Sequence, residues 1–88
     1  MDFAEKVKRV LVRAFHPDYV FLEDDDGLTG YIVHKGFRRM SFLDRQTAID
    51  EALRAESARI TKKEMRNILA IAAFTPEEAA AHGIRVDR

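Results

Sequence analysis

The sequence predicts an α+β fold with two layers, in which helices cover one face of a three-stranded mixed sheet. Apolar residues recur at helical spacing in the first fifteen positions and again from about Phe42 to Ser57. Two short β-prone runs flank an Asp-Gly turn, and a third apolar run, Ile68 to Phe74, follows later. A chain of 88 residues is short for two domains, so we expect a single domain over residues 1–88.

The N-terminal third predicts a helix followed by a β-hairpin. Asp2 is a favourable N-cap, and His16 ends the helix because the residue before a proline avoids helical backbone angles. Strands are expected over Tyr19 to Leu22 and over Leu28 to His34. Between them, Asp24 to Gly27 predicts a tight turn, so these two strands should pair antiparallel.

A second helix is expected from about Phe42 to Ser57, after a short extended piece over Arg38 to Ser41. Ser41, with Asp44 three residues later, is a cap signal. The predicted apolar stripe consists of Leu43, Ile49, Ala52 and Leu53. Asp50 and Arg54 have the spacing of an ion pair on the exposed side.

Two capping boxes frame the last apolar run. Thr61 with Glu64 predicts a short third helix, and Thr75 with Glu78 predicts a final helix. Ile68 to Phe74 indicates a strand buried on both faces, although its alanines and its length also allow a helix. Its helical connection to the hairpin favours parallel pairing. The predicted order is α-β-β-α-α-β-α.

The composition excludes several function classes. Fifteen basic and fifteen acidic residues cancel, which removes the global attraction to nucleic acid of a basic domain. Without cysteine there is no disulfide, thiolate metal site or cysteine nucleophile. No apolar run approaches the roughly 20 residues of a membrane span, and the N-terminus lacks the apolar block of a signal peptide, so we expect a cytoplasmic protein without membrane association.

Catalytic and metal sites find little support. Neither Ser41 nor Ser57 has a histidine and a carboxylate near it in the sequence, as a catalytic serine would need. No glycine-rich phosphate loop is present, so we predict that the protein is not an enzyme. The three histidines lack metal-ligand spacing, and the three consecutive aspartates of the turn lack the spread of a calcium loop. We therefore predict no metal site and no cofactor.

Three segments together resemble the BolA-like family: Gly36 to Gln46, Ala48 to Leu53, and Leu69 to Glu78 with its Thr-Pro-Glu helix start. The resemblance implies a fold similar to the type II KH domain found in bacteria. It also implies a non-enzymatic regulator that pairs with monothiol glutaredoxins around a shared [2Fe-2S] cluster, and some members of the family are linked to DNA binding. Residues Ala58 to Arg66 form an insertion relative to the family pattern.

The chain departs from the family where the cluster would be held. Alignment on the Thr-Pro of the final helix puts Asn67 at the position of the family's ligand histidine. Of the family's Arg-His-Arg signature only Arg45 matches, because the next two positions are Gln46 and Thr47. The hairpin loop, Asp24 to Gly30, has no histidine or cysteine. Iron–sulfur clusters take thiolate or imidazole ligands, so the resemblance here predicts binding without cluster ligation.

Two function hypotheses follow. The first is a regulatory module that binds a protein partner through the face around Arg45, Gln46 and Asn67, with a monothiol glutaredoxin as the partner implied by the resemblance. The alternative is a KH-like nucleic-acid-binding regulator with a local basic patch made of Arg38, Arg39, Arg45, Lys62, Lys63 and Arg66. That patch requires the two groups of basic residues to share a face, where they would contact phosphates.

Overall fold

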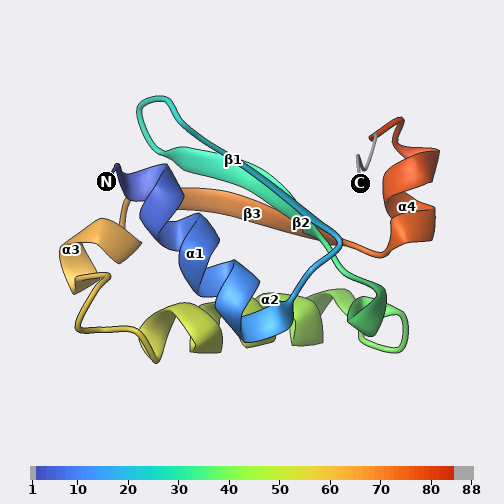
Figure 1. Ribbon diagram of the computed structural model, residues 1–88, viewed down its shortest axis with the longest axis horizontal. Coiled ribbons are helices and arrows are strands. Elements are labelled where there is room, and N and C mark those ends of the chain that lie inside the picture. Colours follow the sequence, from blue (N-terminus) through green and yellow to red (C-terminus); the bar gives the residue numbers. More distant parts are fainter. Residues whose placement is uncertain (1, 85–88) are drawn as a thin grey trace.

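The computed structural model describes residues 2–84, and it has the predicted order of elements. The helices are α1 (Phe3–Phe15), α2 (Phe42–Arg54), α3 (Lys62–Met65) and α4 (Pro76–Ala81), and the strands are β1 (Tyr19–Asp24), β2 (Leu28–Val33) and β3 (Ile68–Phe74). The sheet order is β1-β2-β3 (Figure 1). β1 and β2 pair antiparallel, and β2 and β3 pair parallel, which confirms the mixed three-stranded sheet.

Helices α1 and α2 lie on one face of the sheet, and the core fills the space between the two layers (Figure 1). Its fully or almost fully buried apolar side chains include Val7 and Leu11 of α1, Leu28 and Ile32 of β2, and Ile49 and Leu53 of α2. Each such side chain stabilises the fold by roughly 1.5–3 kcal/mol through its removal from water. Among residues 2–84, no helix has the length and apolar character needed to cross a bilayer.

All four predicted N-caps are confirmed. Asp2 accepts a hydrogen bond from the main-chain N–H of Glu5 at 2.8 Å, and Ser41 accepts one from Asp44 at 3.1 Å. Both predicted capping boxes, at Thr61 and at Thr75, are complete. These contacts satisfy main-chain donors that a helix start leaves without a partner, and each contributes about 1 kcal/mol.

The hairpin turn depends on positive φ angles. Asp26 has φ 55° and Gly27 has φ 127°, which confirms the turn expected from the Asp-Gly pair. Gly27 is also a position of close approach, because a Cβ atom there would lie 2.5 Å from Cδ1 of Leu69. The turn is therefore packed against the beginning of β3.

Two predictions in the middle of the chain are wrong. Residues Lys35–Phe37 form a 3₁₀ helix and Arg38 and Arg39 continue as a turn, so the extended piece is absent before Ser41. Leu43 is 71% exposed and does not belong to the buried stripe of α2. Arg45 takes a buried position instead, in line with Ile49 and Leu53 at a spacing of four residues.

The prediction that β3 is buried on both faces is also wrong. β3 is an edge strand, and Leu69 is 63% exposed. The pairing shifts from Leu28 with Ile68 to Thr29 with Ala70, so Leu69 is an extra residue in a bulge. Helices α1 and α2 cover only one face of the sheet. Aromatic rings of Tyr19, Phe21, Tyr31 and Phe74 pack together on the other face.

Candidate functional site

Arg45, in the first half of α2, joins three separate parts of the chain. Its Nε donates to the carbonyl oxygen of Met40 at 3.1 Å, and its Nη1 donates to the carbonyl oxygen of Ala73 at 3.2 Å. The same Nη1 lies 2.6 Å from Oε1 of Glu78, and the guanidinium carbon lies 5.9 Å from the ring centre of Phe37. Arg45 is only 9% exposed, so its guanidinium is committed to internal contacts.

The carboxylate of Glu78 is shared between this ion pair and the start of α4. Its Oε1 also accepts a hydrogen bond from the main-chain N–H of Thr75 at 2.8 Å. The hydrogen bond from Arg45 is the main cause that lowers the pKa of Glu78, and the bond from Thr75 adds to it. The charged form of Glu78 therefore holds α4 against α2.

Gln46 binds the same strand edge as Arg45. Its Nε2 donates to the carbonyl oxygen of Ile71 at 3.0 Å, two residues before the oxygen that Arg45 contacts. Residues two apart on a strand direct their main-chain groups to the same side. Arg45 and Gln46 thus occupy two outward-facing carbonyls of an edge strand, which blocks the addition of a further strand at Ile71 and Ala73.

Asn67 lies one residue before β3 and away from the other two predicted site residues. Its carbonyl oxygen accepts from the N–H of Leu28 at 2.7 Å, and its own N–H donates to Glu64 at 2.9 Å. Its side chain is exposed and has no hydrogen bond within residues 2–84. At about 3.3 Å per residue, Ile71 lies about 13 Å further along the strand. The structure therefore brings Arg45 and Gln46 together but leaves Asn67 at the far end of the same edge.

Two hollows lie next to each other along the junction of α2 and β3, and we call the pair the seam groove. One hollow, of about 190 Å³, is lined by residues that include Gln46 and Ile68 to Ile71. The other, of about 290 Å³, is lined by residues that include Phe42, Arg45 and Ala72 to Phe74. Large exposed apolar side chains mark its two ends, Leu69 at one and the 74% exposed Phe42 at the other.

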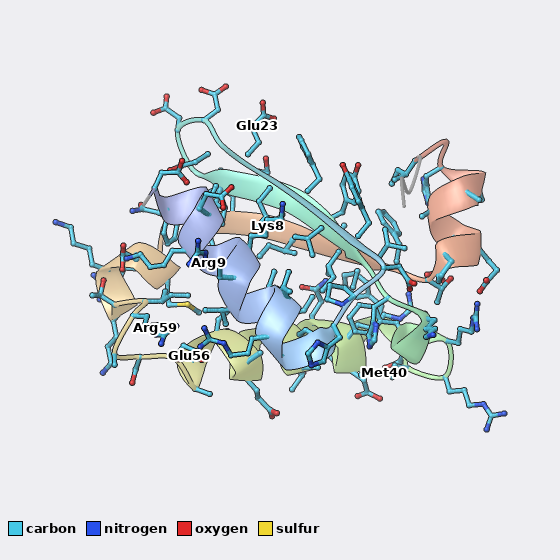
Figure 2. All side chains as sticks on the ribbon, viewed as in Figure 1. Lys8, Arg9, Glu23, Met40, Glu56 and Arg59 are labelled. Atoms are coloured by element: carbon cyan, nitrogen blue, oxygen red, sulfur yellow. The ribbon has the colours of Figure 1, made fainter. Side chains whose placement is uncertain are left out.

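The six basic residues predicted for nucleic-acid binding fall into two separate groups. Arg38 makes a two-pronged ion pair with Glu77 of α4, at 2.9 and 2.7 Å, and this contact lowers the pKa of Glu77. Lys62, Lys63 and Arg66 lie at α3, before β3 begins. β3 has seven residues and spans about 20 Å. Figure 2 shows the same separation, because the labelled Met40 and Arg59, which neighbour the two groups, lie toward opposite ends of the molecule.

The side chain at position 67 does not fit the iron–sulfur cluster that the family resemblance implies. Such a cluster takes thiolate or imidazole ligands, whereas position 67 offers an amide. The imidazoles lie elsewhere, since His16 ends α1, His34 follows β2, and His82 follows α4 with its ring 5.0 Å from that of Phe74. Within residues 2–84 no three histidine, cysteine, aspartate or glutamate residues form a group that fits a metal ion.

Sequence reasoning missed the two exposed apolar side chains and the partner of Arg45. The capping box predicts only the local role of Glu78, which also pairs with Arg45. The spacing of Arg45, Ile49 and Leu53 was a usable signal for the buried side of α2. The exposure of Phe42 and Leu69 had no comparable local signal, because both are ordinary core residues by type.

Comparisons with known proteins identify similar structures. No protein-family model matches the chain, and no curated protein sequence matches it significantly. A Bol-like protein from Babesia bovis superposes with a TM-score of 0.69 at 27% identity, over 94% of this chain and 95% of that one. BolA1 from Arabidopsis thaliana superposes with a TM-score of 0.64 at 22% identity, over 89% and 96%. BolA1 from Mus musculus gives 0.70 at 22% identity, over 97% and 75%.

Proposed function

The chain belongs to the BolA-like family, and on that premise we propose that residues 1–88 form one non-enzymatic regulatory domain that binds a protein partner without ligating an iron–sulfur cluster. The seam groove is the proposed contact surface. Gln46 and Arg45 line the seam groove, and Asn67 lies one residue before β3, which forms one of its walls. Arg45 is buried and acts as a positioning residue.

The exposure of Phe42 and Leu69 at the two ends of the seam groove is the observation that carries this proposal. Large apolar side chains at the surface, next to a hollow with polar groups, are typical of protein contact sites. The carbonyls of Ile71 and Ala73 are already bound by α2. A partner therefore binds here through side chains, and not by adding a strand to β3 at these positions.

A monothiol glutaredoxin is the partner to test first, because the family resemblance implies it. Titration calorimetry should detect association with the cluster-free glutaredoxin. Phe42→Ala and Leu69→Ala should each weaken that association by roughly tenfold, the loss typical of an interface anchor. Val12→Ala is the matched control, because Val12 is an exposed apolar residue of α1 outside the seam groove.

The absence of ligation is tested separately by visible absorption after iron and sulfide are added to the mixture. We expect no spectrum of a shared cluster from the natural chain. If Asn67→His restores one, the alignment of position 67 with the family's ligand histidine is supported. A coloured heterodimer formed by the natural chain, whether or not it is sensitive to Asn67→Ala, would contradict the proposed loss of ligation.

Nucleic-acid binding remains the alternative, and it is narrowed to the cations of α3. Lys62, Lys63 and Arg66 form no ion pair with carboxylates of residues 2–84, whereas Arg38 is paired and Arg45 is buried. Arg39 is exposed and makes no ion pair with these residues either, but it stands apart from the other three in the turn before α2. Affinity for a single-stranded oligonucleotide that falls steeply between roughly 50 and 200 mM salt would favour this alternative, since phosphate contacts release counterions.

A further inference from the structure

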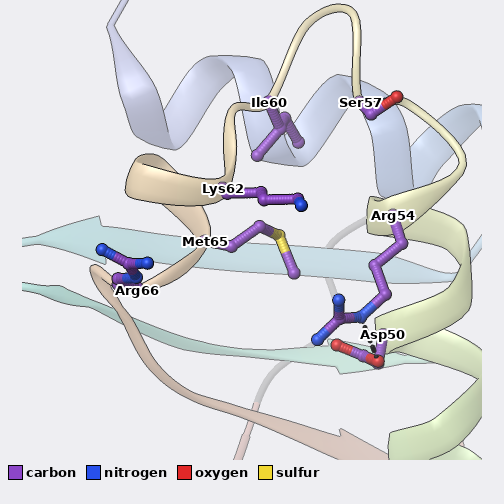
Figure 3. Close-up of a pocket in the computed structure, with 7 residues that line it drawn as sticks. All are labelled: Asp50, Arg54, Ser57, Ile60, Lys62, Met65 and Arg66. Atoms are coloured by element: carbon purple, nitrogen blue, oxygen red, sulfur yellow. Dashed lines mark hydrogen bonds and ion pairs between the residues drawn. The ribbon is translucent and has the colours of Figure 1, made fainter.

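Another hollow, of about 540 Å³, lies between the end of α2 and α3 (Figure 3). We infer that this hollow, which we call the α3 groove, binds an extended acidic segment of the protein partner. An apolar side chain of that segment packs on Ile60 and Met65, and its carboxylates contact Lys62 and Arg66. The inference rests on the proposed function and specifies the chemistry of the partner.

The charge of the α3 groove favours an anionic ligand. Three basic side chains line it, and one of them, Arg54, is neutralised by Asp50 at 2.7 Å. Lys62 and Arg66 have no carboxylate partner among residues 2–84. Two unpaired cations beside one hollow attract carboxylates and disfavour basic partners.

The floor of the groove favours an apolar side chain over a nucleobase. Ile60 is buried in the core, and Met65 is half-buried and packs against the same core. Methionine adapts its shape to different apolar ligands. None of the described residues that line the groove is aromatic, so it offers no ring on which a base would stack.

The groove is held in a fixed shape and continues into the seam groove. Lys6 of α1 donates to the carbonyl oxygen of Arg59 at 3.0 Å and pairs with Glu64 of α3 at 2.8 Å. These contacts anchor the short α3 before any partner arrives. Asp50 and Met65 line both hollows. A segment that leaves the α3 groove therefore reaches Leu69, where the proposed partner surface begins.

Selection from a phage-displayed library of random dodecapeptides on the full chain tests the inference. We expect peptides in which aspartate or glutamate flanks an apolar residue. For a synthetic consensus peptide measured by fluorescence anisotropy, Lys62→Glu and Arg66→Glu should each raise the Kd by roughly tenfold or more. Lys63→Glu is the matched control, because Lys63 carries the same charge on the same helix but does not line the groove. It should change the Kd by less than about twofold.

Several results would overturn the inference. The selection could enrich no peptides over an unrelated protein, or it could give a consensus without acidic residues. Lys63→Glu could raise the Kd of the peptide as much as Lys62→Glu does. An oligonucleotide could bind with the same dependence on Lys62 as the peptide. The same variants, tested with the protein partner, separate this inference from the proposed function. Loss of partner binding with Phe42→Ala and Leu69→Ala but not with Lys62→Glu would leave only the proposed function standing. Indifference of the partner to all of these variants would overturn both.

Discussion

Nη1 of Arg45 lies 2.6 Å from Oε1 of Glu78, although the two residues are 33 positions apart in the chain. Their contact joins α2 to α4. It does so beside the carbonyl of Ala73, which the same Nη1 also contacts. The edge of β3, the start of α2 and the start of α4 therefore meet at one guanidinium. The shape of the seam groove depends on this meeting point.

Removal of the guanidinium should destabilise the fold. Arg45→Ala removes the guanidinium donor from the carbonyls of Met40 and Ala73 and from the carboxylate of Glu78. We expect a loss of about 2 kcal/mol, the scale of hydrogen bonds to charged groups. Urea unfolding followed by circular dichroism measures it. Arg54→Ala is the control, because it breaks an exposed pair with Asp50 that contributes only about 0.3–0.5 kcal/mol. Equal losses for the two variants would contradict the positioning role of Arg45.

Stability should fall in acid as three paired carboxylates are protonated. Hydrogen bonds from Lys6, Arg38 and Arg45 are the main causes that lower the pKa values of Glu64, Glu77 and Glu78, respectively. Their pKa values in the folded state lie below the unfolded value of about 4.5, so the stabilisation is complete above that pH and is lost as the pH falls through the folded values.

Glu78→Gln isolates one of these contributions. Glutamine at this position keeps the capping box but removes the charge that pairs with Arg45. The variant should therefore be less stable than the natural chain at pH 6, and the difference should shrink toward pH 3. Urea midpoints over this range measure it. Glu23→Gln, a change of an exposed carboxyl outside these pairs, should leave the pH profile unchanged.

His34 should make stability depend on pH in a separate, higher range. Its ring contacts the rings of Phe15 and Phe37, with centroid distances of 5.8 and 5.1 Å, and its Nδ1 is buried without a hydrogen bond within residues 2–84. Burial is the main cause that lowers its pKa from 6.5, and the negative charge of Asp18 opposes that effect.

The sign follows from proton binding. Because the unfolded chain protonates this histidine more readily than the folded chain, stability is complete above about pH 6.5 and declines below it. Urea midpoints should therefore fall between pH 7.5 and 5.5, before the carboxylates titrate. His34→Phe should flatten this decline. His16→Asn, which removes an exposed imidazole, should preserve it, and a decline that persists in His34→Phe would assign the effect to another group.

Gly27 and Leu69 should be energetically coupled. Gly27→Ala places a methyl group against Leu69 at a positive φ angle, and we expect a loss of roughly 1–3 kcal/mol. In a Leu69→Ala background the steric part of that loss should disappear, and only the cost of the backbone angle should remain. A double-mutant cycle measured by thermal unfolding gives the coupling directly. Strict additivity would show that the two residues do not touch.

The two proposed anchors of the seam groove should matter little for stability. Phe42 and Leu69 are mostly exposed, so alanine at either position should change the free energy of unfolding by about 0.5 kcal/mol or less. Leu53→Ala is the contrasting change, since a buried leucine typically contributes about 2–5 kcal/mol. Thermal unfolding of the three variants separates a binding role from a packing role.

Local rules in the sequence were sufficient for the four α-helices and the three strands, although they missed the 3₁₀ helix at Lys35–Phe37. Asp2, Ser41, Thr61 and Thr75 each cap a helix through a main-chain group three residues away, and such contacts can be predicted without knowledge of the rest of the chain. The turn at Gly27 and the parallel pairing of β3 follow from equally local signals and from the length of the connection. The resemblance to the BolA-like family depended on these same segments.

The order of the strands in the sheet was decided only in three dimensions. It makes β3 an edge strand, so that Leu69 is exposed and α2 lies along the free edge of β3. The distances that separate Asn67 from Gln46 and the two groups of basic residues follow from this arrangement. The pairing of Arg45 with Glu78 likewise depends on elements that are distant in the chain. The type of a residue indicates only whether its side chain prefers to be buried or exposed. Whether it is actually buried depends on which other helices and strands pack beside it.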